Sequence, residues 1–307
     1  MLANYAKTLL SFSFAWLVLA GCRPAGTDNQ TAGETAPPLT TPANLNIQLL
    51  PTPAATQIQE PTLITHTLPQ GPDGEWHLVV IGDSSLWGLG EALVQQIETD
   101  TGVKVTLYDV SLGGLSAGRV LKALEDGKDP DLKLKKLSGW LAEAEMVVMW
   151  TNPEDSSDPQ YPFEIDGCFR SNPPGEYSAQ GLDRFSADLA AIWARIFELR
   201  QGQPIILRGM DLYNPLVAPW QENGVFEACT ECWEILSAAA RRGSEMQGVP
   251  FLSRLDAFNG PAHDEDPRLK GFIREDGEHP TEAAGRFTAQ LLSEMGYEAT
   301  FPAQAAP

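Results

Sequence analysis

Apolar and polar positions form a repeating pattern from about residue 76 onward, in which short apolar runs are separated by longer amphipathic segments. Short apolar runs bounded by turn residues are typical of strands that are buried on both faces of a sheet. We therefore predict strands over residues 77–83, 103–110, 145–151 and 204–210, and a weaker fifth strand over residues 248–253.

The segments between these strands have the periodicity of helices. Apolar side chains recur at positions i, i+3 and i+4 over residues 182–196, and residues 132–144 and 231–246 show a similar pattern. A last helix follows Pro280, which suits a first helical turn, and Gly296 can cap its end. Alternating strands and helices predict an α/β fold with a parallel sheet covered on both faces. In such sheets ligands bind beyond the carboxyl ends of the strands, so we expect chemistry at the strand ends.

The pattern is different at the N-terminus. Lys7 precedes an apolar run, residues 9–22, that is shorter than the roughly 20 residues of a membrane span. The order of positive charge, apolar run and small residues is typical of an export signal, and a buried helix, the alternative, has no partner nearby. The sequence Leu-Ala-Gly-Cys at its end resembles a bacterial lipobox. We therefore expect Cys22 to be lipidated and to hold the exported protein on a membrane, facing outside the cytoplasm.

Residues 23–74 are rich in Thr, Pro, Ala and Gln and show neither helical nor strand periodicity. Such a composition is typical of a disordered tether. The chain is thus divided into a lipoprotein signal peptide (1–22), a tether (23–74), a folded domain (75–298) and a C-terminal tail (299–307).

The net charge of the chain is −20, from 41 acidic and 21 basic residues. This excess of negative charge repels phosphate backbones and argues against nucleic-acid binding. A metal site formed by His263, Asp264 and Asp266 is a weak alternative to a solvated loop, because the acidic run lacks a recognisable ligand spacing. We expect no metal, no organic cofactor and a monomer.

Four cysteines are present, and lipidation of Cys22 would leave Cys168, Cys229 and Cys232. An odd number outside the cell predicts one disulfide and one spare thiol. A bond from Cys168 to either of the others would tie a long loop to a later helix, and a bond between Cys229 and Cys232 is the alternative. The pairing stays open.

Polar residues and glycines that suit acyl transfer follow three strands and precede the last helix. They are Gly82, Asp83, Ser84, Gly113, Gly114, Asn152, Asp276 and His279. A serine hydroxyl becomes a nucleophile when a base removes its proton, and a carboxylate can orient that base. His279 could serve as the base, with Asp276 three residues earlier on its other nitrogen. The tetrahedral intermediate needs donors, which the N–H groups of Ser84 and Gly114 and the amide of Asn152 could supply.

The four segments resemble the blocks of the SGNH (GDSL-type) hydrolase family, in the order of that family. The match at the C-terminal block is the most specific, because Asp276 and His279 are followed by a proline and a small-residue helix start. The resemblance implies a flavodoxin-like three-layer sandwich with a five-stranded parallel sheet. It also implies ester or thioester hydrolysis through an acyl-enzyme on Ser84, with His279 as base, Asp276 orienting it, and Ser84, Gly114 and Asn152 as the oxyanion hole.

The sequence departs from the family pattern in two places. The first block has Ser85 where many members have leucine, and Pro153 stands where an aspartate usually follows the asparagine. Gly113 and Gly114 both fit the glycine position. Trp87 and Trp150 could line an acyl or sugar pocket, although core packing is the favoured interpretation for Trp150.

The long segment over residues 153–177 starts at the site and is expected to overhang it, with Cys168 able to pin it. We expect an exported serine esterase acting on a small-molecule or glycan ester. The alternatives are an acyltransferase or carbohydrate O-deacetylase on the same site, or a non-catalytic surface binding protein. An acetylated cell-wall sugar, a phospholipid and a short-chain ester all remain open as substrates.

Overall fold

The computed structural model describes residues 74–153 and 179–302. The export signal, Cys22, the tether up to residue 73 and most of the segment predicted to overhang the site lie outside the described residues. Among the helices of the described part, none combines the length and the apolar character that crossing a membrane requires.

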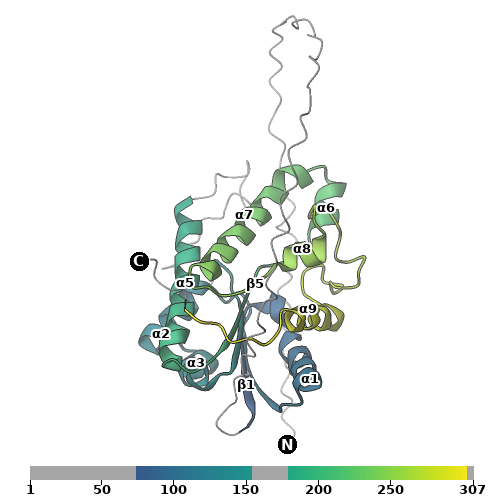
Figure 1. Cartoon of the computed structure of the whole chain (residues 1–307). Coiled ribbons are helices and arrows are strands. Elements are labelled where there is room, and N and C mark those ends of the chain that lie inside the picture. Colours follow the sequence, from purple (N-terminus) through teal and green to yellow (C-terminus); the bar gives the residue numbers. More distant parts are fainter. Residues whose placement is uncertain (1–73, 154–178, 303–307) are drawn as a thin grey trace, which may run out of the picture. The chain divides into compact units, whose positions relative to one another are not determined.

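A sheet of five parallel strands forms the centre of the domain (Figure 1). Its strands are β1 (Trp76–Gly82), β2 (Val105–Ser111), β3 (Met146–Trp150), β4 (Ile206–Met210) and β5 (Phe251–Leu252). They lie in the order β2-β1-β3-β4-β5, and each neighbouring pair is parallel. This confirms the predicted α/β fold with a five-stranded parallel sheet. The fifth strand is only two residues long, which explains its weak apolar run.

Helices cover both faces of the sheet (Figure 1). They are α1 (Leu89–Thr101), α2 (Ala117–Asp126), α3 (Leu132–Glu143), α5 (Ala179–Arg200), α6 (Val217–Glu222), α7 (Phe226–Glu245), α8 (Arg254–Asn259) and α9 (Glu282–Glu294), together with a short 3-10 helix, η2 (Ser84–Leu86). Helices α1 and α9 pack against each other on one face, and α5 packs against α2, α3 and α7 on the other. The result is a three-layer arrangement.

Side-chain caps set where several of these helices begin. Asp131 accepts from the backbone N–H of Lys133 at the start of α3, and Thr281 accepts from Ala284 N at the start of α9. The last helix therefore starts at Glu282. Pro280, which was expected in its first turn, lies just before the capping residue Thr281.

The core lies on both faces of β1 and β3. Residues 78–81 of β1 are fully buried, as are the apolar side chains of β3. Trp150, at the end of β3, is 1% exposed and contacts Phe185 of α5 edge-on, which confirms that it is a core residue. The continuous apolar runs of the sequence thus correspond to strands covered on both sides.

The chain beyond α9 continues along the sheet. Thr300 forms an antiparallel bridge with Ile205, and its hydroxyl accepts from the backbone N–H of Leu207 at 3.0 Å. Thr300 is 6% exposed, so the packed part of the chain extends at least to this residue.

Candidate active site

The turn after β1 presents Ser84 at the carboxyl end of the sheet. The side chain of Asp83 accepts from the backbone N–H of Ser85 at 2.8 Å and caps η2. At Gly82 a Cβ atom would overlap the carbonyl oxygen of Trp150 on β3, so only glycine lets the two strand ends approach this closely. Local sequence and strand pairing together fix the position of Ser84.

His279 lies in the loop before α9 and reaches Ser84 from the other end of the chain. Its Nε2 is 3.2 Å from Ser84 Oγ, and its Nδ1 is 3.0 Å from Asp276 Oδ2. The other carboxylate oxygen of Asp276 accepts from the backbone N–H groups of Glu278 and His279 at 3.0 and 2.9 Å. The three residues proposed from the sequence as nucleophile, base and orienting carboxylate therefore form one continuous line of polar contacts.

The surroundings of Asp276 favour the ionised form of its carboxylate. Partial burial would raise the pKa of Asp276, but hydrogen bonds from the backbone N–H groups of His279 and Glu278 and from the imidazole outweigh it, and the pKa is lowered. A carboxylate that stays ionised can orient the imidazole and stabilise the imidazolium that forms when the base takes a proton.

Trp87 covers one face of the imidazole. The two rings are stacked, with centroids 4.8 Å apart and planes at 9°. Trp87 is 37% exposed, and the guanidinium of Arg274 lies 6.0 Å from the centroid of its ring. The sequence left open whether this tryptophan lines a substrate pocket or packs in the core, and its described ring contact is with the imidazole of His279.

The loop after β2 is held between the ends of β1 and β3. Leu112 N donates to Gly82 O at 2.8 Å, and Asn152 N donates to Leu115 O at 2.9 Å. Within this loop, Gly114 has a φ of 67°, a backbone conformation that residues with a side chain rarely adopt. This geometry distinguishes Gly114 from Gly113, whose φ is not in that region.

Asn152 is held by a buried carboxylate. Its Nδ2 donates to Asp83 Oδ2 at 2.6 Å, and Asp83 is 4% exposed. Burial raises the pKa of Asp83, and the positive charge of Arg254 acts in the opposite direction. An asparagine amide carries two N–H bonds, so one remains for another acceptor when the first is used by Asp83.

Sequence reasoning missed two residues near this site and gave a third, Asp83, no role of its own. Asp83 orients Asn152 and caps the serine turn. Tyr213 and Arg254 follow β4 and β5 and are both 1% exposed, and no local motif marks them. The one available signal was their place just after strands, at the edge where the other candidate residues lie.

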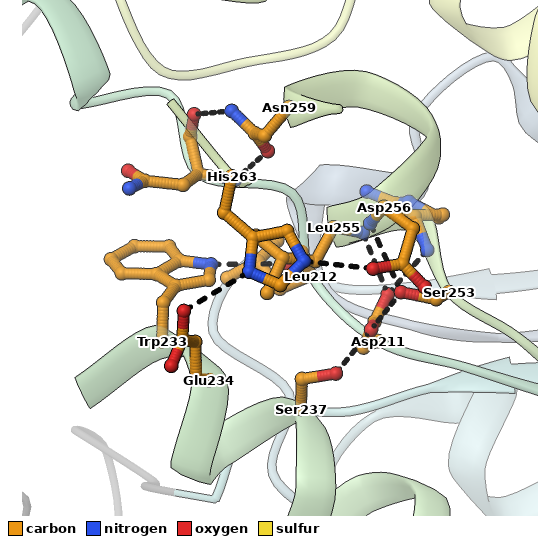
Figure 2. Close-up of polar contacts among 12 residues, drawn as sticks. Asp211, Leu212, Trp233, Glu234, Ser237, Ser253, Leu255, Asp256, Asn259 and His263 are labelled. Atoms are coloured by element: carbon orange, nitrogen blue, oxygen red, sulfur yellow. Dashed lines mark hydrogen bonds and ion pairs between the residues drawn. The ribbon is translucent and has the colours of Figure 1, made fainter. Parts of the chain in front are cut away.

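The remaining predicted groups lie apart from this constellation. His263 contacts Glu234 Oε1 and Asp256 Oδ1 at 3.3 and 2.7 Å (Figure 2), whereas Asp266 is paired with Arg268. The imidazole of His263 therefore contacts other carboxylates than Asp264 and Asp266, with which the sequence offered only a weak possibility of a metal site. Within the described ranges, no three His, Cys, Asp or Glu side chains are arranged to hold a metal ion.

Cys229, at the buried face of α7, is disulfide-bonded and 0% exposed. Its two possible partners from the sequence are Cys168 and Cys232, whose side chains are outside the described set. The choice between them stays a prediction.

Comparison with known proteins adds evidence on the fold. No family model and no curated protein matches the chain. Among solved structures, the lipase Lip_vut3 from a goat rumen metagenome superposes with a TM-score of 0.51 at 16% identity, over 73% of this chain and 98% of that one. Phospholipase A1 from Streptomyces albidoflavus has a TM-score of 0.43 at 12% identity, over 73% and 100%. The lipase/acylhydrolase from Enterococcus faecalis has a TM-score of 0.40 at 15% identity, over 75% and 100%.

Identities this low show a shared fold and nothing finer, and the weaker superpositions carry no argument. The comparison with the rumen lipase agrees with the five-stranded parallel sheet and its flanking helices. The chain therefore has the α/β fold that this lipase also has.

Proposed function

We propose that the chain is a serine hydrolase that cleaves carboxylic esters through an acyl-enzyme on Ser84. The observation that carries the proposal is the line of contacts from Asp276 through His279 to Ser84 Oγ, at 3.0 and 3.2 Å. A hydroxyl, an imidazole and a carboxylate in this order form the arrangement that activates a serine. The fold shared with a lipase is consistent with this chemistry.

In the proposed reaction, His279 Nε2 takes the hydroxyl proton of Ser84 while Ser84 Oγ attacks the carbonyl carbon of the ester. The tetrahedral intermediate collapses, and the departing alcohol takes that proton from His279. Water then attacks the acyl-enzyme, His279 accepts a proton from the water, and this proton returns to Ser84 Oγ as the carboxylic acid leaves. Asp276 stays ionised and holds the imidazole in one tautomer throughout.

The oxyanion of each tetrahedral intermediate needs donors that are fixed beforehand. We assign this role to the backbone N–H groups of Ser84 and Gly114 and to the second N–H of Asn152. The support for Asn152 is its bond to Asp83, which fixes the amide plane. The support for Gly114 is the loop geometry that only glycine tolerates easily.

We further propose that the enzyme is exported and anchored at Cys22, with esters of glycans or small molecules outside the cytoplasm as its substrates. The support is the apolar run and the Leu-Ala-Gly-Cys sequence that ends it. A tether that follows the anchor would give the domain reach above the membrane surface.

The nucleophile is tested by labelling the purified protein with a fluorophosphonate and measuring intact mass. We expect one adduct on the wild type and none on Ser84→Ala. Ser85→Ala is a matched control, because it removes the neighbouring hydroxyl and leaves the backbone groups of this turn in place, and it should still be labelled. A folded wild type that takes up no label, or a Ser84→Ala protein labelled as fast as the wild type, would contradict the assignment.

A further inference from the structure

Ser84 and His279 are 195 residues apart in the chain, yet their reactive atoms are 3.2 Å apart. Ser84 belongs to the η2 turn, and His279 belongs to a loop in which Asp276 and Glu278 are exposed. A misplacement of about 1 Å between reacting groups can reduce turnover by about a hundredfold. The serine turn and the histidine loop therefore need buried contacts that fix the distance between them.

Arg254 provides the contact to the serine side. It is the first residue of α8 and is 1% exposed. Its Nη2 donates to the backbone carbonyl of Ser85 at 3.2 Å, within the turn that carries Ser84. Burial lowers the pKa of Arg254, and the charges of Asp83 and Asp211 act in the opposite direction.

Tyr213 provides the contact to the histidine side. Its hydroxyl donates to the backbone carbonyl of Glu278 at 3.0 Å, next to His279 in the chain. Tyr213 is 1% exposed, and burial raises its pKa, so the hydroxyl keeps the proton that it donates. The guanidinium of Arg254 lies 4.8 Å from the centroid of the Tyr213 ring, within the range of a cation–π contact.

Asp211 fixes the position of Arg254. It follows β4, is fully buried and accepts from the backbone N–H groups of Arg254 and Leu255 at the start of α8. The hydroxyls of Ser237 and Ser253 donate to the same carboxylate (Figure 2). Three of these hydrogen bonds tie the start of α8 to Asp211 after β4, and the fourth, from Ser237, comes from α7.

We propose that Arg254 and Tyr213 are positioning residues that connect the serine turn to the histidine loop and set the separation of Ser84 Oγ and His279 Nε2. This inference rests on the proposed esterase function. The connection runs from the carbonyl of Ser85 through the guanidinium and the phenol ring to the carbonyl of Glu278. A leucine–phenylalanine pair could fill the same space, but it could not bind either carbonyl.

The sharpest test is Tyr213→Phe, which keeps the ring and its contact with Arg254 but removes the hydroxyl. With para-nitrophenyl acetate as substrate, we expect kcat to fall about tenfold, while KM changes by less than about twofold. The rate of phosphonylation of Ser84 should fall by a similar factor. Tyr297→Phe is the matched control, because it removes a tyrosine hydroxyl that donates to Asp100, away from the site, and it should keep the wild-type rates.

Circular dichroism at the assay temperature gives the folded fraction of each variant. A loss of kcat at an unchanged folded fraction supports the proposal. A kcat within twofold of the wild type, or a loss that only follows the folded fraction, overturns it. A wild type without turnover or labelling would overturn the esterase proposal and this one together, so the two failures are distinguishable.

Arg254→Lys tests whether the two residues act through one connection. Lysine keeps the charge but lacks the planar guanidinium that stacks on the ring and donates to Ser85 O. If the connection is shared, the double variant with Tyr213→Phe should lose less than the product of the two single losses. Losses that multiply would overturn the coupling, and if Arg254→Lys does not fold, the Tyr213→Phe result alone decides the proposal.

Discussion

The side-chain amide of Asn152 shows how one residue of the candidate site can be oriented by a buried neighbour. Asp83 accepts one of its N–H bonds at 2.6 Å, and the second is left for the oxyanion in the proposed reaction. Asp83 also caps η2, so a single buried carboxylate fixes both the serine turn and the amide. Asp83 therefore belongs to the candidate site in addition to shaping the turn.

We predict that Asn152→Ala lowers kcat by about 100- to 1,000-fold, because one oxyanion donor is lost. The measurement is steady-state hydrolysis of para-nitrophenyl acetate. Asn223→Ala removes an exposed amide that donates to Pro219 O and should leave the rate unchanged. Wild-type turnover in Asn152→Ala would remove the residue from the oxyanion hole.

The individual site residues that could be predicted from the sequence are those whose partner lies close by in the chain. Asp276 and His279 are three residues apart, so one turn brings them together and a motif can be recognised. Arg254 and Tyr213 have no such neighbour, and arginine is normally an exposed residue. Their role arises from contacts with Ser85 and Glu278, which only the folded chain brings near.

Among the elements, the short helix α8 is held by polar contacts of its first turn. Its start is tied to Asp211, and Asp256 of its first turn contacts His263, whose φ is 55°. His263 also contacts Glu234 of α7, so this imidazole joins two helices and a loop (Figure 2). The position of α8 matters because it carries Arg254.

The pH dependence of this contact can be predicted. Burial alone would lower the pKa of His263, but the hydrogen bonds to Asp256 and Glu234 outweigh it and raise the pKa above its ordinary value of 6.5. The folded protein then holds the proton more tightly than the unfolded chain does. The stabilisation is fully present below the ordinary value and is lost as the pH rises through the raised one.

The test is urea unfolding of the wild type and His263→Gln across this pH range. We expect the substitution to cost more free energy of unfolding at pH 6 than at pH 9. A cost that does not vary with pH would mean that the imidazole makes no charged contact in solution.

Element boundaries show which patterns a sequence carries. Four strands lie within about two residues of their predicted limits, because each is a continuous apolar run. The helices α6 and α8 were missed, since six residues are too few to show a helical period. Helix α2 was also not predicted, although Ser116 caps it. Helix α7 begins before its predicted start, at Phe226.

For the molecule as a whole, the topology explains why distant residues meet. All five strands are parallel, so their carboxyl ends lie at one edge, and the loops after β1, β2 and β3 carry Ser84, Gly114 and Asn152 there. The same rule made the fold and this part of the candidate site predictable from the sequence. The identity of the ester was not predictable, because the sheet supports many chemistries.

The proposed membrane anchor is a property of the entire chain and can be tested independently of the site. In a bacterial host that processes lipoproteins, we expect the wild type to incorporate an alkyne-labelled fatty acid and to sediment with membranes. Cys22→Ser should incorporate none, because no thiol remains at the end of the apolar run. Cys168→Ser serves as the control and should be labelled like the wild type, and equal labelling of Cys22→Ser would contradict the proposal.

The separation of nucleophile and base along the chain has a consequence for synthesis. Ser84 leaves the ribosome 195 residues before His279, which in the described part of the chain is followed by α9 and the segment that packs beside β4. A nascent chain, or one truncated before residue 279, would carry the serine without the group that activates it. The proposed enzyme would therefore be inert until His279 has been synthesised and has folded against the serine turn, so that folding itself would delay hydrolysis.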